Sequence, residues 1–173
     1  MVNKGLLRKF LDYSVATIIN KGLFFLILPI LTYYLLPEEY AIYSLLMFFA
    51  SLVSMFFQFG LQQSLMTLYH SQKTDASRYK LISTTYLSIF LITFLGSICL
   101  LGWHQTILKL ILNITITSLH KKLYIFTIFY IIFNLFTAVT LILLNIRHDS
   151  KQFSYLSLSK NSLLFIFIVV GAI

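Results

Sequence analysis

The sequence predicts an all-α integral membrane protein. Hydrophobic residues make up 59% of its 173 positions and charged residues only 10%, whereas about a quarter of the residues in soluble domains are charged. The apolar residues form long runs, and an α-helix needs about 20 of them to cross a hydrocarbon layer roughly 30 Å thick. We expect a single partial transmembrane domain, residues 1–173, with spans at about 13–36, 41–66, 81–103, 123–144 and 153–173.

The first two spans are predicted to be antiparallel neighbours joined by a tight outer turn. Span one follows a basic segment but ends at the bulky pair Tyr33-Tyr34, without the small residues of a signal-peptide cleavage site, so we expect it to be retained. Pro37 lies in the turn, and Glu38 and Glu39 follow it. Carboxylates favour the positive end of a helix dipole, which indicates that helix two begins here.

The later connections differ in length and polarity. Residues 69–80 form a polar inner loop before span three. The outer segment 104–122 is longer, and its apolar residues 107, 108, 111 and 112 recur at helical spacing. This pattern favours a short amphipathic helix on the outer surface over a re-entrant loop. Span five is half polar and runs to the end at Gly171-Ala172-Ile173, from which we expect a truncated chain.

The distribution of basic residues predicts the orientation. One side of the membrane receives eight: Lys4, Arg8, Lys9, Lys73, Arg78, Lys80, Arg147 and Lys151. The other side receives three: Lys109, Lys121 and Lys122. Because the side richer in Lys and Arg is normally cytoplasmic, the N-terminus is predicted to be cytoplasmic.

Composition also excludes several classes of function. The net charge of +8 would suggest nucleic acid in a soluble protein, but here the basic residues lie between spans, where they contact anionic lipid headgroups. We therefore expect membrane lipids, and no nucleic acid, as partners. Cys99 is the only cysteine, so no disulfide framework or cysteine metal site is expected. The four histidines lie in different loops, and we expect no catalytic residues, no metal, no cofactor and no enzyme activity.

Polar residues within the spans fall on stripes. Span one carries Tyr13, Thr17, Asn20, Lys21 and Phe24, span two carries Ser44, Ser51, Ser54, Gln58 and Gln62, span four carries Thr127, Tyr130, Asn134, Thr137 and Asn145, and span five opens with Ser154, Ser157 and Asn161. Lipid offers no hydrogen bonds, so such stripes should face protein or a water-filled cavity. Helix packing alone is one explanation. The other is a cavity, for which the candidate substrate-binding residues are Thr17, Asn20, Lys21, Gln58, Gln62 and Asn134.

Lys21 is the most informative of these candidates. A lysine in mid-membrane costs about 2.5 to 3.5 kcal/mol on insertion scales. Lys21 lies about 12 Å along span one by helical rise, so its stem either reaches the inner headgroups or lines a cavity, and its neighbours Asn20 and Thr17 favour the cavity. All five acids, Asp12, Glu38, Glu39, Asp75 and Asp149, lie outside the apolar runs. Any cavity would therefore be neutral to cationic and would favour an anionic ligand such as a phosphate or diphosphate.

The run NKGLFFLILPILTYYLLPEEYAIYSL at residues 20–45, followed by FQFGLQQSLMTLYHSQK at residues 57–73, carries a family likeness. A Lys-Gly in helix one, a Leu-Pro-Ile-Leu-Thr run, a Leu-Pro-Glu-Glu-Tyr turn and a Phe-Gly-Leu near the end of helix two form the shared pattern. With these motifs the chain resembles the polysaccharide biosynthesis or O-antigen flippase family, the bacterial Wzx-type transporters of the multidrug/oligosaccharidyl-lipid/polysaccharide exporter superfamily.

The resemblance implies part of the N-terminal bundle of a 12- or 14-helix exporter fold in the bacterial inner membrane. It implies a transporter that flips a lipid diphosphate-linked oligosaccharide, with Lys21 as a cationic cavity residue beside Asn20 and with Gln58 and Gln62 as polar cavity candidates. The expected chain is a truncated member. Two alternatives stay open: a multidrug cation exporter of the same superfamily, and a small helical membrane protein that partners a polysaccharide polymerase complex.

Overall fold

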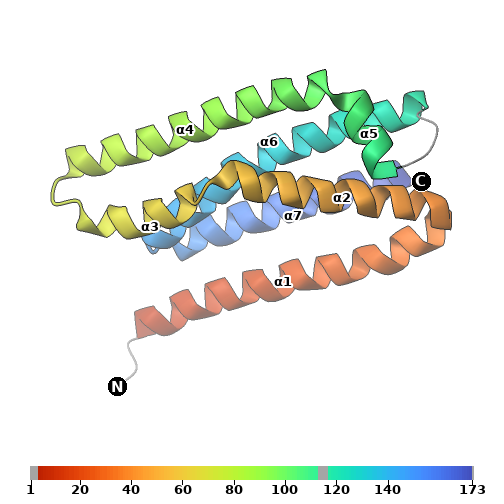
Figure 1. Ribbon diagram of the computed structural model, residues 1–173. Helices are drawn as coiled ribbons and strands as arrows, with labels where there is room; N and C mark the ends of the chain where they lie inside the picture. Colours follow the sequence, from red (N-terminus) through yellow and green to blue (C-terminus); the bar gives the residue numbers. More distant parts are fainter. Residues whose placement is uncertain (1–3, 113–116, 173) are drawn as a thin grey trace. The chain divides into compact units, whose positions relative to one another are not determined.

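Residues 4–112 and 117–172, which the computed structural model describes, form seven α-helices and no strand (Figure 1). The helices are α1 (Lys4–Tyr34), α2 (Pro37–Gln58), α3 (Leu61–Ser71), α4 (Asp75–Gly102), α5 (His104–Leu112), α6 (Ser118–Ile146) and α7 (Ser150–Ala172). Their continuity follows from long apolar runs with few internal Gly or Pro residues, because in lipid the backbone N–H and C=O groups must bond within the helix. Side chains are described for these residues except 4–10, 12, 24 and 165–172.

Four helical segments in the described residues are long and apolar enough to cross a membrane. They are Tyr13–Tyr34 within α1, Pro37–Ser71 over α2 and α3, Asp75–Gly102 as α4, and Ser118–Ile146 as α6. This confirms the predicted class of an all-α membrane protein. The fifth predicted span corresponds to α7, and its insertion into the membrane stays a prediction. Ile173, the last residue of that predicted span, lies outside the described residues, as do residues 113–116 of the outer segment.

The second predicted span is broken rather than continuous. Helix α2 ends at Gln58 and α3 begins at Leu61, and between them Phe59 has a φ of 42° and Gly60 a φ of 69°. Left-handed backbone interrupts an α-helix, and glycine adopts it without the clash that a Cβ causes. The helix is therefore interrupted at the Phe-Gly-Leu motif, which hydropathy alone does not reveal.

Acidic side chains mark the starts of several helices. A carboxylate oxygen of Glu39 accepts a hydrogen bond from the backbone N–H of Leu36 at 3.0 Å, and Glu38 lies in the same first turn of α2. Asp75 begins α4 and pairs with Arg78 at 3.1 Å. Both placements satisfy or complement the positive N-terminal end of a helix. The predicted start of helix two at the Pro37 turn is thus confirmed.

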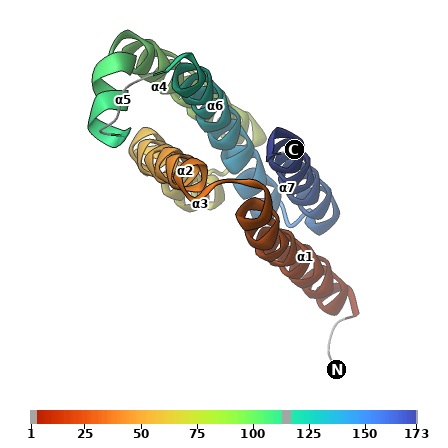
Figure 2. The ribbon, with the colours of Figure 1, turned by 90° about the vertical axis from the view of Figure 1, so that its right-hand side faces the viewer.

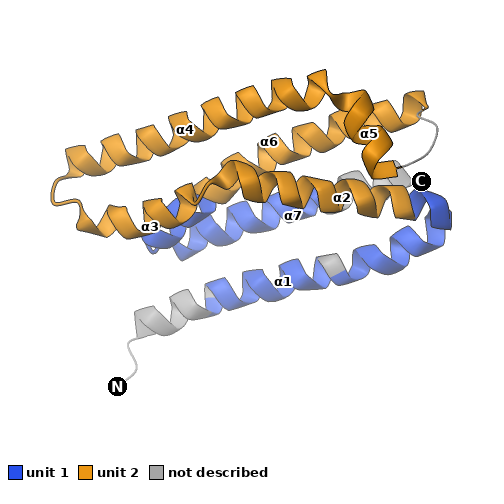
Figure 3. Cartoon of the chain, viewed as in Figure 1, with its two compact units in different colours: residues 1–40, 140–173 blue, residues 41–139 orange. Residues whose placement is uncertain are grey.

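The chain divides into two compact units, residues 1–40 with 140–173 and residues 41–139 (Figure 3). In the first unit α1 packs along α7, and the two helices run in the same direction (Figures 1 and 2). Tyr13 meets Phe153 edge to face, with ring centroids 4.9 Å apart. Ala16, three residues further along α1, is 1% exposed, and so small a side chain allows two helices to approach closely.

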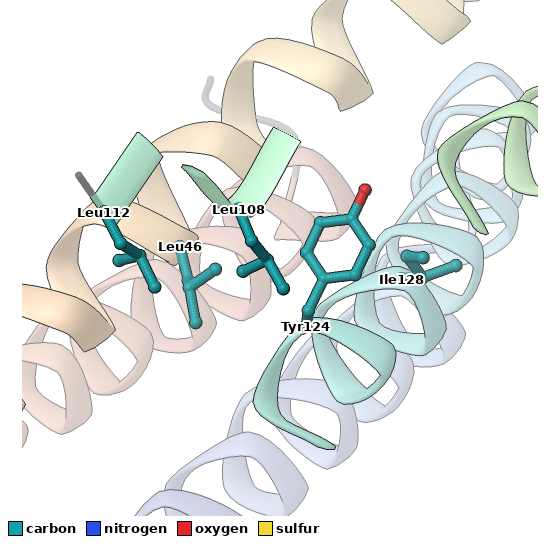
Figure 4. Packing of buried hydrophobic residues seen from close by; sticks show 5 residues of the cluster. All are labelled: Leu46, Leu108, Leu112, Tyr124 and Ile128. Carbon is teal, nitrogen blue, oxygen red and sulfur yellow. The ribbon is translucent and has the colours of Figure 1, made fainter. Parts of the chain in front are cut away.

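The second unit is centred on a small apolar cluster. Leu46 of α2, Leu108 and Leu112 of α5, and Tyr124 and Ile128 of α6 are buried together. Figure 4 shows the Tyr124 ring between Leu108 and Ile128. The helix predicted in the outer segment is confirmed as α5, because its spacing brings Leu108 and Leu112 to one buried face. Its position relative to a membrane stays a prediction.

Two further contacts hold α4 in this unit. The Tyr124 hydroxyl donates a hydrogen bond to the backbone carbonyl of Leu100 at 3.1 Å. A Cβ built on Gly96 would overlap the ring of Phe57 from α2. A side chain at position 96 would therefore force the Phe57 ring to move, and small residues are common where helices contact one another in membranes.

Candidate functional site

The polar stripe predicted on span one is divided between two faces of α1. Tyr13 and Asn20 are half-buried and face α7, through the Tyr13–Phe153 ring contact and a hydrogen bond from Asn20. Thr17 and Lys21 are exposed. The predicted stripe covers 12 residues, from Tyr13 to Phe24. Its positions drift around a helix of 3.6 residues per turn, so part of the stripe can lie outside an interface.

Asn20 is the best-defined member of the candidate site. Its side-chain Nδ2 donates to the hydroxyl of Ser157 on α7 at 2.7 Å, and Ser157 is 8% exposed. The Oδ1 atom of Asn20 is also buried, without a hydrogen-bond partner among the described residues. A buried amide with one free acceptor can still accept a hydrogen bond from water or from a ligand hydroxyl.

Thr17 and Lys21 lie one helical turn apart on the exposed face of α1. The hydroxyl of Thr17 donates to the backbone carbonyl of Tyr13 at 2.8 Å, which satisfies it within its own helix. Lys21 presents a cation. In the described part of the chain, the acids of the four candidate spans lie only at their starts, as Glu38, Glu39 and Asp75. The positive charge of Lys21 is therefore not neutralised by a carboxylate deep in its own or another candidate span.

The other three candidates belong to the second unit. Gln58 is the last residue of α2 and Gln62 the second residue of α3, so the two amides lie on either side of the helix break. Both are half-buried, as is Asn134 of α6. The structure thus groups Thr17, Asn20 and Lys21 on neighbouring turns of α1, and Gln58 with Gln62 about the break. It assigns these two groups to different units.

Several polar residues outside the candidate set have a role in the structure. Ser157 lies on the polar stripe of span five, but nothing in the sequence pairs it with Asn20, because that pairing depends on which helix lies beside α1. Ser54 of α2 and Thr93 of α4 are 4% and 2% exposed, and their hydroxyls have no hydrogen-bond partner among the described residues. Ser54 lies three residues before Phe57, and Thr93 lies three residues before Gly96. Both are therefore near the contact between Phe57 of α2 and Gly96 of α4.

The histidines serve local roles at helix ends. The ring of His104 contacts the carbonyl of Leu101 at 2.9 Å, and the Nδ1 of His120 accepts from the N–H of Thr117 at 3.2 Å. His148 lies in the turn between α6 and α7 with a φ of 56°. In the residues that the structure describes, no group of three or more His, Cys, Asp or Glu side chains could hold a metal ion.

Four long apolar helices in the described part of the chain define the class of a multi-pass helical membrane protein. Residues 6–173 match the family of polysaccharide biosynthesis proteins. The chain belongs to this family, as the motifs of its first two spans indicate. No curated protein and no solved structure matches it.

Proposed function

We propose that this chain takes part in moving a lipid diphosphate-linked oligosaccharide, such as a repeat unit of O-antigen, capsule or a teichuronic-type polymer, from the inner to the outer leaflet of the bacterial plasma membrane. Membership of the polysaccharide biosynthesis family supports a role in polysaccharide assembly. The apolar helices support a function within the membrane. The work is transport and not bond chemistry, and the N-terminus is cytoplasmic.

One observation carries the choice of cargo. Lys21 is an exposed cation on an apolar helix, next to the half-buried Asn20, and within the four candidate spans the acids lie only at the span starts. A cation at this depth is costly unless it has a partner. A diphosphate supplies such a partner, because charge-assisted hydrogen bonds from ammonium to phosphate oxygens are among the strongest in proteins.

Binding to the purified chain tests the proposal. The chain is reconstituted in lipid nanodiscs and titrated with a fluorescent lipid diphosphate-linked oligosaccharide. Lys21→Ala should weaken binding by about tenfold or more, since a hydrogen bond to a charged group contributes about 1.5–3 kcal/mol. Lys73→Ala removes an exposed cation from the loop before α4 and serves as the charge-matched control.

Equal affinity of the wild type and Lys21→Ala would reject Lys21 as a phosphate contact and restore the interpretation that it reaches the lipid headgroups. Transport is measured separately, by placing Lys21→Ala in a full-length relative and following the labelled cargo across liposomes. We expect flipping to be abolished while insertion into the membrane is preserved.

The two alternatives predict different outcomes, each in its own assay. A multidrug exporter would accumulate organic cations under a sodium or proton gradient, and cation coupling needs an embedded carboxylate, which the described candidate spans carry only at their starts. A helical partner of a polysaccharide polymerase would form a stable complex of defined mass by native mass spectrometry.

A further inference from the structure

The contact between α1 and α7 contains a hydrogen bond between two polar side chains, Asn20 and Ser157. Tyr13 contacts Phe153 of the first turn of α7, and Asn20 donates to Ser157 at 2.7 Å further along both helices. The buried or half-buried positions of α1 include Tyr13, Ala16, Asn20, Ile27 and Leu31. Their spacing of three, four or seven residues is that of a heptad seam between helices that lie nearly parallel.

A polar residue in such a seam contributes to register. An Asn at a seam position favours the pairing in which its amide has a hydrogen-bond partner, because an unpaired amide is costly in a water-poor interface. Here the partner is Ser157, which is 8% exposed and so has little access to water. Sliding α1 by one turn against α7 would bring the Asn20 amide away from this hydroxyl.

The same hydrogen bond determines the rotation of α1. Consecutive residues on an α-helix point about 100° apart, so an Asn20 side chain held toward α7 directs Lys21 away from it. The structure agrees, since Asn20 is half-buried while Lys21 and Thr17 are exposed. A rotation that broke the bond to Ser157 would carry Lys21 around the helix axis by the same angle.

We propose that Ser157 is a positioning residue for Lys21, acting through Asn20. The Asn20–Ser157 hydrogen bond sets the rotation and register of α1 against α7, and thereby the direction in which the ammonium group is presented. The consequence for cargo rests on the proposed function, in which Lys21 contacts the diphosphate. The effect on the packing of α1 against α7 does not rest on the proposed function.

Cysteine cross-linking tests the register directly. Cys99 is the only cysteine, so Cys99→Ser gives a background into which Tyr13→Cys and Phe153→Cys are introduced together in the full chain. Under a mild oxidant, Ser157→Ala should slow disulfide formation by about 3- to 10-fold, the range expected for an interhelical hydrogen bond in a membrane protein. Ser157→Thr keeps the hydroxyl and should restore the rate. Ser159→Ala changes an exposed serine on the same helix and should have no effect.

Binding of the labelled lipid diphosphate-linked oligosaccharide is the second measurement. Ser157→Ala should weaken it several-fold in the presence of Lys21 and should add nothing in a Lys21→Ala background, because the residue acts through Lys21. Unchanged cross-linking in Ser157→Ala overturns the positioning role, whatever the binding data show. Altered cross-linking, together with no effect of Lys21→Ala on binding, would support the role of Ser157 in the packing of α1 against α7. It would reject the proposed function instead.

Discussion

Threonine and serine side chains in the spans mostly hydrogen-bond to their own helix. Thr85, Thr127 and Thr137 are buried, and each donates to the carbonyl four residues earlier at 2.8–2.9 Å. Such bonds satisfy a hydroxyl without a second helix. Thr127 and Thr137, which lie on the predicted stripe of span four, therefore need no cavity to satisfy their hydroxyls. The amides of Asn20, Gln58, Gln62 and Asn134 are larger and carry both donors and an acceptor, so they retain more potential to bind a ligand.

His148 ends α6 in a conformation that glycine adopts more easily. Its φ is 56°, its N–H bonds to the carbonyl of Asn145, and the N–H of Asp149 bonds to that of Leu144, both at 3.0 Å. This is the pattern of a Schellman motif, with histidine at the position that glycine usually occupies. Asp149 then accepts from the N–H of Gln152 at the start of α7. The adjacent pair His148-Asp149 thus has a structural role in the turn.

We expect His148→Gly to stabilise the protein by about 0.5–1 kcal/mol, because the strain of a Cβ in the left-handed region exceeds the added backbone entropy of glycine. The measurement is the midpoint of thermal unfolding in detergent micelles. His148→Ala removes the imidazole and keeps the strain, so it should give no such gain. Equal stabilisation by both variants would contradict the argument from the backbone and implicate the imidazole itself.

At the scale of elements, the break between α2 and α3 is the main departure from simple hydropathy. Residues 37–71 are apolar enough to form one span, yet Phe59 and Gly60 both have positive φ. A Cβ on Gly60 would meet no atom within 4 Å. Any effect of adding one must therefore come from the backbone conformation and not from crowding.

Gly60→Ala should lower stability by about 1–2 kcal/mol, the usual cost of a left-handed residue with a Cβ. Gly22→Ala is the matched control, since Gly22 lies inside α1 and its added Cβ also meets nothing; alanine there should stabilise by up to about 1 kcal/mol. Both are compared by thermal unfolding under the same conditions. Unchanged or increased stability of Gly60→Ala would mean that α2 and α3 form one continuous helix.

For the whole molecule, the excess of basic residues on one side predicts the topology across the membrane. In the Cys99→Ser background, single cysteines are placed at Glu38, Lys73, Leu110 and Lys151, all of which are exposed. An impermeant maleimide should label positions 38 and 110 in intact cells, and positions 73 and 151 only after permeabilisation. The reverse pattern would place the N-terminus outside and would reject the cytoplasmic side assigned to the positive loops.

The positions of the helices follow from the sequence because local physics determines them. A run of about 20 apolar residues must become a helix in lipid, where every backbone N–H and C=O needs a partner. Pro37 with Glu38 and Glu39 marks the start of α2, and the spacing of Leu108 and Leu112 marks a buried face of α5. The motifs of the first two spans were sufficient to indicate the family, since they depend on order along the chain alone.

The pairing of helices depends on contacts between residues far apart in the sequence. Asn20 and Ser157 are 137 positions apart, and no periodicity in either helix indicates which neighbour α1 will choose. The division of the span-one stripe, with Asn20 toward α7 and Lys21 exposed, likewise appears only once α7 is in place. The sequence alone determined that this is a helical membrane protein with a cation in its first span, because burial of apolar surface and backbone hydrogen bonding act locally. Only the tertiary structure decided which face of α1 is covered, because helix rotation is set by contacts with a partner helix.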